Sequence, residues 1–372
     1  MKRFLRVIWT LYTLLLAILF LPASLSAFIP PSSLSYITLF GLLFPYLLVL
    51  LILTAIINLF IRKKLAVLLF ILLPFGFRNL VNSYAFNRAQ FTWAAPKGSL
   101  RILTWNVEGY VSLLPQSNPL AQGRVKLLNL IHRINPDILC LQECNNVENE
   151  PPLVSVTHEL DSLGYPYHFF SNDQVRGKRP GWYQVQGVAI FSKLPLLDST
   201  RTLIFHQPSH DENLASVTIL FRQKPLRIFT GHLRSFALFP DTARSSDEGT
   251  NIYEQAYDRK RSILYKLRET EDTHEAETSI IRREIEKSTV PVIYCGDMNS
   301  TPASYNFRYL KGALQDAFLE KGSGLGATFY KIAPTLRIDV CFADDRLKVI
   351  QTKVVRQKIS DHYPLITDVR WR

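Results

Sequence analysis

Polar residues that could bind a metal or a phosphate follow apolar, strand-forming runs of this chain. The clearest run, 290–295, ends in Gly296 and is followed by Asp297 and Asn299. An acid and an amide two residues apart are also typical of a simple turn. Similar residues follow or interrupt other apolar runs, namely Asn106, Glu143, His232, Asp339, Asp361 and His362.

Taken singly, a strand-end Asn or Asp is usually a turn or cap, and a lone His is usually structural. Asp339 is harder to dismiss, because a carboxylate between Ile338 and Val340 must be paired if it is buried. Carboxylate and carboxamide oxygens suit Mg²⁺ or Mn²⁺ rather than zinc. Such an ion offsets charge on a phosphate, while an aspartate aims a water and a histidine moves a proton or binds phosphoryl oxygens. The set predicts metal-assisted phosphoester hydrolysis.

The elements that must position these residues alternate along one block, 100–372. We expect helices at 124–134 and 253–287. Strands are expected at 100–107, 137–142, 165–170, 187–192, 214–221, 226–233, 290–295, 337–342, 347–354 and 363–369. Many strands with few helices predict a single α+β domain with packed sheets, rather than alternating βαβ units.

Charge separates this block from residues 1–98. That first part contains no Asp or Glu and nine of the 43 Lys and Arg residues, so 34 cations face 31 acids in the remainder. The soluble part is therefore nearly neutral, and its net charge gives no support to a nucleic-acid surface. A stretch rich in Tyr, Lys and Arg within 253–287 could contact nucleic acid or lipid headgroups, but its many Glu residues favour a solvated helix. Arg176, Lys178 and Arg179 form a second basic patch that could border the site.

Residues 1–86 are expected to cross a membrane. Apolar runs at about 5–28 and 34–61 each exceed the roughly 20 residues that span a bilayer. The first could instead be a cleavable signal peptide, because Lys2 and Arg3 precede an apolar core that ends near Ala27. A third run, 65–86, reaches spanning length only if its less apolar half is included, so two or three transmembrane helices are possible. A linker, 87–99, then leads to the domain at 100–372.

The number of spans decides the side of the membrane. Cations lie before the first run and after the second, where the positive-inside rule places the cytoplasm. These are Lys2, Arg3, Arg6, Arg62, Lys63 and Lys64. Three spans place the domain on the extracytoplasmic side and two keep it inside; we favour three, because 65–73 is uniformly apolar. The four cysteines have no metal-site spacing and are expected to be buried free thiols, which weakly favours a reducing compartment.

Residues 100–372 resemble the endonuclease/exonuclease/phosphatase superfamily in a series of motifs that occur in the family's order. They are Thr104-Trp105-Asn106-Val107, Leu141-Gln142-Glu143, Thr230-Gly231-His232-Leu233, Gly296-Asp297-Met298-Asn299, Arg337-Ile338-Asp339 and Ser360-Asp361-His362. The resemblance implies a four-layer αββα sandwich with its site at one edge of the two sheets.

The resemblance also implies a role for each residue. The family's metal ligands, for Mg²⁺ or alternatively Mn²⁺, correspond to Asn106, Glu143 and Asp361. Its phosphate-binding residues correspond to Asn106, His232 and Asn299. Catalytic roles fall to His232, to Asp297 as the residue that positions water, to Asn299 as its partner, and to Asp339, which orients His362.

The leading hypothesis is thus a membrane-tethered, metal-dependent phosphoesterase. Cys144-Asn145 after Glu143 and Ser300-Thr301-Pro302 after Asn299 differ from apurinic endonucleases, which disfavours DNA repair. A phosphodiester, in nucleic acid or in a phospholipid headgroup, is favoured over a phosphomonoester. The alternative is an inactive, membrane-anchored binding module of the same fold, against which the complete residue set argues. Besides the substrate and the bilayer, no protein partner follows from the sequence.

Overall fold

The chain divides into two compact units, and neither is continuous in sequence. The computed structural model describes residues 2–372 except 35, 89, 111–117, 119–120, 149–152, 180–181, 207–210 and 237–262. Unit 1 comprises the described parts of Met1–Asn79, Arg234–Glu277 and Ala303–Asn306, and unit 2 those of Leu80–Leu233, Thr278–Pro302 and Phe307–Arg372. This division differs from a simple boundary in the predicted linker.

Unit 1 is built around apolar helices. The helices are α1 (Lys2–Leu25), α2 (Ile37–Ile61), α3 (Lys63–Leu72), the 3-10 turn η1 (Leu73–Gly76) and α4 (Phe77–Ser83), whose last residues belong to unit 2. Three stretches are long and apolar enough to cross a membrane, and the third, Lys63–Ser83, runs through α3, η1 and α4. The third run, which the sequence left open, is thus long and apolar enough to cross a membrane when its less apolar half is included.

Polar side chains join these helices near both ends. The start of α1 meets the end of α2, where Trp9 donates a 3.0 Å hydrogen bond to the Asn58 side chain. At the other end, Asn79 of α4 donates to the carbonyl oxygens of Ala23 and Ser24 at 2.9 and 3.2 Å. The start of α1 and the end of α2 therefore lie at one end of the helical group, and the end of α1 lies with α4 at the other.

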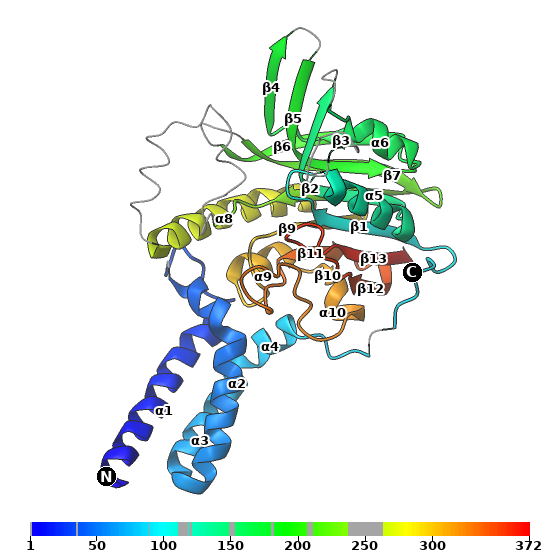
Figure 1. Ribbon diagram of the computed structural model, residues 1–372. Helices are drawn as coiled ribbons and strands as arrows, with labels where there is room; N and C mark the ends of the chain where they lie inside the picture. Colours follow the sequence, from blue (N-terminus) through cyan, green and yellow to red (C-terminus); the bar gives the residue numbers. More distant parts are fainter. Residues whose placement is uncertain are drawn as a thin grey trace. The chain divides into compact units, whose positions relative to one another are not determined.

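Unit 2 contains two mixed β-sheets (Figure 1). In the described residues the first sheet has the order β12-β13-β1-β2-β5-β3, with β4 also paired to β5, and the second has the order β10-β11-β9-β8-β7-β6. The first sheet comprises β1 (Leu100–Asn106), β2 (Ile138–Glu148), β3 (Tyr167–Phe170), β4 (Gln174–Arg179), β5 (Trp182–Ser192), β12 (Leu347–Val354) and β13 (Leu365–Trp371). The second comprises β6 (Leu196–His206), β7 (Asp211–Phe221), β8 (Lys224–His232), β9 (Val292–Asp297), β10 (Gln315–Asp316) and β11 (Asp339–Ala343).

Three buried clusters produce four layers. One cluster fills the space between the sheets, with Ile102 and Ile190 from the first and Ile228 and Ile293 from the second. The outer face of the first sheet packs on α5 (Gln122–Ile134) and α6 (Val156–Ser162), and that of the second on α9 (Tyr305–Lys311) and the C-terminal part of α8 (Ile263–Glu286). A short helix, α10 (Ala317–Lys321), follows β10. The predicted αββα sandwich is confirmed.

Several elements differ from the expectation. Strands β4 and β6 were not predicted; β6 is largely exposed, so its sequence lacks a buried apolar run. The predicted helix at 253–287 is described only from Ile263, and its earlier part lies outside the described residues. The predicted linker packs on unit 2, since Thr92 exchanges hydrogen bonds with Gln351. All four cysteines are free and buried, as expected.

Each sheet has a parallel pair at its centre, β1 with β2 and β8 with β9. Parallel strands end at the same edge of a sheet, and an antiparallel neighbour begins there. Strands β11 and β13 are antiparallel to β9 and β1. At one edge of the first sheet β1 ends, β13 begins and β2 passes with Gln142 level with Asn106. At one edge of the second sheet β8 and β9 end and β11 begins.

Candidate active site

The predicted residues lie at this shared edge. Asn106 at the end of β1 is level with Gln142 of β2, and His232 at the end of β8 is level with Asp297 of β9. Asp339, the first residue of β11, pairs with Asp297 from the other side. Register thus places Asn106 beside Gln142 in the first sheet, and His232, Asp297 and Asp339 side by side in the second.

A buried hydrogen bond joins the two sheets beneath the site. The Gln142 amide of β2 donates to the Thr230 hydroxyl of β8 at 2.9 Å, and it also bonds with Thr104 of β1. Buried amides that are fully bonded restrict the packing of their neighbours. The network fixes the first sheet's site residues against those of the second.

A β-bulge re-aims Glu143. The pairing of β2 with β5 shifts between Leu141 and Cys144, and Glu143 has a positive φ of 50°. Bulges commonly redirect a side chain beside functional sites. Here the amide of Asn106 donates to Glu143 at 3.0 Å and to Asp297 Oδ2 at 3.1 Å, and so holds two carboxylates near each other.

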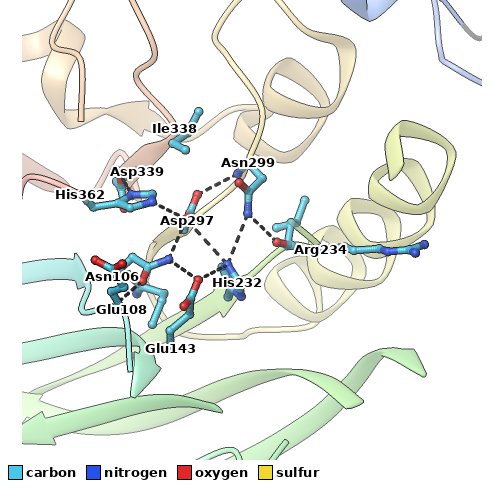
Figure 2. Close-up of polar contacts among 12 residues, drawn as sticks. Asn106, Glu108, Glu143, His232, Arg234, Asp297, Asn299, Ile338, Asp339 and His362 are labelled. Carbon is cyan, nitrogen blue, oxygen red and sulfur yellow. Dashed lines mark hydrogen bonds and ion pairs between the residues drawn. The ribbon is translucent and has the colours of Figure 1, made fainter. Parts of the chain in front are cut away.

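Asp297 is at the centre of the cluster and is almost fully buried (Figure 2). Its Oδ1 accepts from the backbone N–H of Asn299 at 2.9 Å, a local turn that needs a positive φ of 45° at Asn299. The Asn299 amide donates to the Leu233 carbonyl at 2.8 Å and lies 3.4 Å from Nε2 of His232. The backbone just after β8 therefore fixes Asn299, and Asn299 fixes Asp297.

His362 is held by Asp339. Its Nδ1 lies 2.8 Å from Asp339 Oδ2, and its Nε2 faces Asp297 Oδ2 at 3.6 Å. The backbone N–H of Asp339 donates a hydrogen bond to the Thr328 hydroxyl at 3.1 Å. The Trp105 indole N–H donates to the His362 carbonyl at 2.9 Å. Hydrogen bonds thus hold both the backbone carbonyl and Nδ1 of His362, and its Nε2 is directed at Asp297.

His232 is surrounded by three acids. Its Nδ1 is 3.7 Å from Glu212, and its Nε2 is 3.6 Å from Glu143 and 3.8 Å from Asp297. Burial lowers the pKa of His232, but Glu212, Glu143 and Asp297 outweigh burial and raise that pKa to about 10. The ring is accordingly cationic near neutral pH.

Burial and neighbouring charges also shift the pKa values of His362 and Asp297. Burial lowers the pKa of His362, but Asp339 and Asp297 outweigh it and raise the pKa to about 10. Burial raises the pKa of Asp297, and Asp339 raises it further, against the lowering effect of the two histidines. The site thus places two imidazolium cations beside a carboxylate that is a stronger base than usual.

Asp361 lies at the rim, not in the buried cluster. Lys331 is 3.3 Å from Asp361 and 3.2 Å from Glu108, and the Asp361 N–H donates to Glu108 at 3.1 Å. Asp361 is linked to Asn106 through Ser360, whose hydroxyl lies 2.7 Å from the Asn106 carbonyl and 3.2 Å from Asp361 Oδ1.

The donor set fits a hard divalent cation. Oxygen ligands from several carboxylates and an amide match what Mg²⁺ and Mn²⁺ prefer. Asp297, Asp339 and His362 each offer a ligand atom within 4.8 Å of the others. The Oδ1 of Asp339 is buried without a hydrogen-bond partner among the described residues. The Asp339–His362 hydrogen bond uses Oδ2 and Nδ1, so these two residues could offer Oδ1 and Nε2 to a ligand.

The structure brings seven of the eight predicted residues into one hydrogen-bonded and ion-paired network, and Asp361 joins it through Ser360 and Glu108. The sequence interpretation missed Glu212, Glu108 and Lys331. Glu212 had one available signal, because it lies at the start of β7, two residues before the apolar run that begins at Leu214. Its position beside His232 depends on the pairing of β7 with β8, which the sequence pattern did not define.

Comparison with known proteins identifies relatives of both parts of the chain. A model of the Endonuclease/Exonuclease/phosphatase family matches residues 103–362, and a model of a domain of unknown function matches residues 3–84. An endonuclease/exonuclease/phosphatase structure from Beutenbergia cavernae is 18% identical, with a TM-score of 0.51 over 74% of this chain and 72% of that chain. The human Nocturnin catalytic domain with bound sulfate is 16% identical, with a TM-score of 0.49 over 74% and 94%. D. rerio TDP2 with a single-strand DNA product is 16% identical, with a TM-score of 0.47 over 74% and 100%. No curated protein matches the chain.

Proposed function

Because the chain belongs to the endonuclease/exonuclease/phosphatase family, we propose that it is a membrane-tethered, metal-dependent phosphoesterase that hydrolyses a phosphodiester. The observation that carries the proposal is the position of Asp297, whose carboxylate is fixed by Asn299 and Asn106 and flanked by both histidines. A fixed, buried carboxylate beside two cations can aim a water at a phosphate that the cations bind.

Each side chain then has a role. Asp297 accepts a hydrogen bond from the attacking water and takes its proton, helped by its raised pKa. His232 and His362 donate hydrogen bonds to the phosphoryl oxygens, on which negative charge grows. Glu143, Asn106 and Asp361 would hold Mg²⁺ or Mn²⁺, which supplies Lewis-acid stabilisation of the same charge. Asn299 keeps Asp297 aimed, and Asp339 keeps His362 aimed.

Turnover of bis-p-nitrophenyl phosphate by the full chain in detergent, with Mg²⁺ or Mn²⁺, tests the proposal. Asp297→Asn should lower kcat by about 10²–10⁴, the usual contribution of a general base. Asp344→Asn is the matched control, since Asp344 is a partly buried carboxylate after β11, paired with Arg346 away from the site. Absence of metal-dependent turnover on a broad diester panel would favour the inactive binding module instead.

We also propose that three spans place the domain on the extracytoplasmic side. The cations Arg3 and Arg6 lie near the start of α1, Arg62 lies between α2 and α3, and Lys63 and Lys64 begin α3. The contact of Trp9 with Asn58 supports placing these cations at one end, whereas Asn79 bonds to the opposite end of α1. Reporters fused after residue 98 that function only inside or only outside the cell give the test; activity of the inside reporter would contradict the orientation.

A further inference from the structure

Two chain segments that follow catalytic strand ends belong to unit 1. Strand β8 ends at His232, and the chain enters unit 1 at Arg234; Asn299 is followed four residues later by Ala303, also in unit 1. Within that unit, the hydroxyl of Ser26, just beyond α1, donates to the Ala303 carbonyl at 2.6 Å. Four residues of chain reach at most about 14 Å. Asn299 is therefore joined by a short covalent connection to a residue bonded at the end of a candidate span.

The surface beside the site has the composition of a membrane interface. Residues 329–332 read Phe-Tyr-Lys-Ile, and Phe329 forms a backbone bridge with His362 and has its ring 4.9 Å from the imidazole. The Tyr330 ring stacks on Tyr363 at 4.7 Å, and Ile332 is 48% exposed. Aromatic, cationic and exposed aliphatic side chains gather where proteins meet lipid headgroups. We name residues 329–332 the rim loop.

The described charges at the rim do not resemble a track for a polyanion. Glu108 and Asp361 both face solvent in part, and Lys331 of the rim loop is paired with both. Binding a nucleic-acid strand depends on several cations that each neutralise a phosphate. An acidic rim whose lysine is already paired is better matched to a zwitterionic headgroup, whose cationic group the acids can face, than to a polyanion.

From these observations, and resting on the phosphodiesterase activity proposed above, we propose that the substrate is a phospholipid of the bilayer that holds the three helices, reached through the rim loop. The water oxygen bonds to phosphorus and one P–O ester bond breaks. The water's proton passes by way of Asp297 to the leaving alcohol. The products are a phosphomonoester and an alcohol, which are diacylglycerol with a headgroup phosphate, or phosphatidic acid with a free headgroup alcohol.

The test uses the full chain reconstituted in vesicles of phosphatidylethanolamine and phosphatidylglycerol. Release of diacylglycerol or phosphatidic acid is measured beside hydrolysis of bis-p-nitrophenyl phosphate and of single-stranded DNA and RNA by the same sample. We expect metal-dependent phospholipid turnover. Ile332→Glu should lower the ratio of the vesicle rate to the soluble-diester rate by about tenfold, because it replaces an apolar side chain that partitions into the interface.

Leu197→Glu is the matched control. Leu197 is 56% exposed and lies near the start of β6, at the opposite end of the sheet from His232, so its ratio should stay at the wild-type value. Turnover of the soluble diester without phospholipid turnover would overturn this inference and leave the phosphodiesterase intact. Faster turnover of DNA or RNA, or equal ratios for the two glutamate variants, would also overturn it. If no diester of any kind is cleaved, the proposed function itself fails.

Discussion

Asp339→Asn isolates how the site orients a histidine. Asp339 is fully buried, and its Oδ2 accepts from Nδ1 of His362 at 2.8 Å. Asparagine has nearly the same shape and keeps the backbone pairing of Asp339 with Asp297. Its amide nitrogen, however, would present a donor to Nδ1 and favour the wrong tautomer or a rotated ring. His362 would then offer Nε2 to the phosphate in the wrong state.

The expected loss is in kcat, by about 10²–10⁴, equivalent to about 3–5.5 kcal/mol of transition-state stabilisation. The free energy of unfolding should fall by only about 1–2 kcal/mol, because one charged hydrogen bond is weakened and no cavity forms. Rates are measured with bis-p-nitrophenyl phosphate on the full chain in detergent, and stability by denaturant unfolding of the same sample. Asp344→Asn serves again as the control and should change kcat little.

A double-mutant cycle decides whether Asp339 acts through His362. If it does, Asp339→Asn combined with His362→Ala should be no slower than His362→Ala alone, because residues that act as a unit are strongly non-additive. Multiplication of the two losses would refute the reasoning. An Asp339→Asn enzyme with wild-type kcat would refute it as well.

Three further predictions follow from other contacts. A chelator should abolish diester hydrolysis, and Mg²⁺ or Mn²⁺ should restore it, whereas activity that persists after dialysis against chelator would exclude the metal. Burial raises the pKa of Asp173 from 3.8 to about 7, so ionisation is disfavoured in the fold and wild-type stability should fall as pH rises from about 4 to 7. Asp173→Asn cannot ionise and should gain up to about 4 kcal/mol over wild type across that window in pH-dependent unfolding, while the exposed control Asp161→Asn should not. Gly41→Val should lower the midpoint of thermal unfolding in detergent by an amount equivalent to about 1–3 kcal/mol, since even a Cβ there would lie 2.8 Å from the Ala303 carbonyl; the exposed Leu43→Val on the same helix should change it little.

Local patterns in the sequence predicted an α+β domain with packed sheets and the candidate residues at its strand ends, while the family resemblance implied the four-layer sandwich. Buried strands such as β1 and β9 are apolar runs that end at Asn106 and Asp297, and their period and end points are visible in the chain. The order of the motifs supplied the rest. Candidate residues whose position is set by the end of their own strand could therefore be predicted.

The residues that were missed depend on pairing between distant segments. Glu212 lies beside His232 only because β7 runs antiparallel to β8, and Lys331 lies beside Asp361 because the rim loop bridges to His362. A lysine in a polar loop has the same local sequence signal whether it borders a site or faces solvent. Local pattern could not separate these cases.

The division of the chain into units also depends on contacts between residues that are far apart in the sequence. Ser26 and Ala303 are 277 residues apart, and the Ser32 N–H and hydroxyl both donate to Glu275 at 2.9 Å across 243 residues. Matches to separate family models at 3–84 and 103–362 suggest a tether attached to an independent enzyme. These contacts argue otherwise, because the segment after Asn299 takes a hydrogen bond from the end of α1. Removing residues 1–86 would take away both that donor and Gly41 of α2, where even a Cβ would lie 2.8 Å from the Ala303 carbonyl. The Ser26 hydrogen bond therefore ties the segment that follows Pro302 to the end of α1 within unit 1.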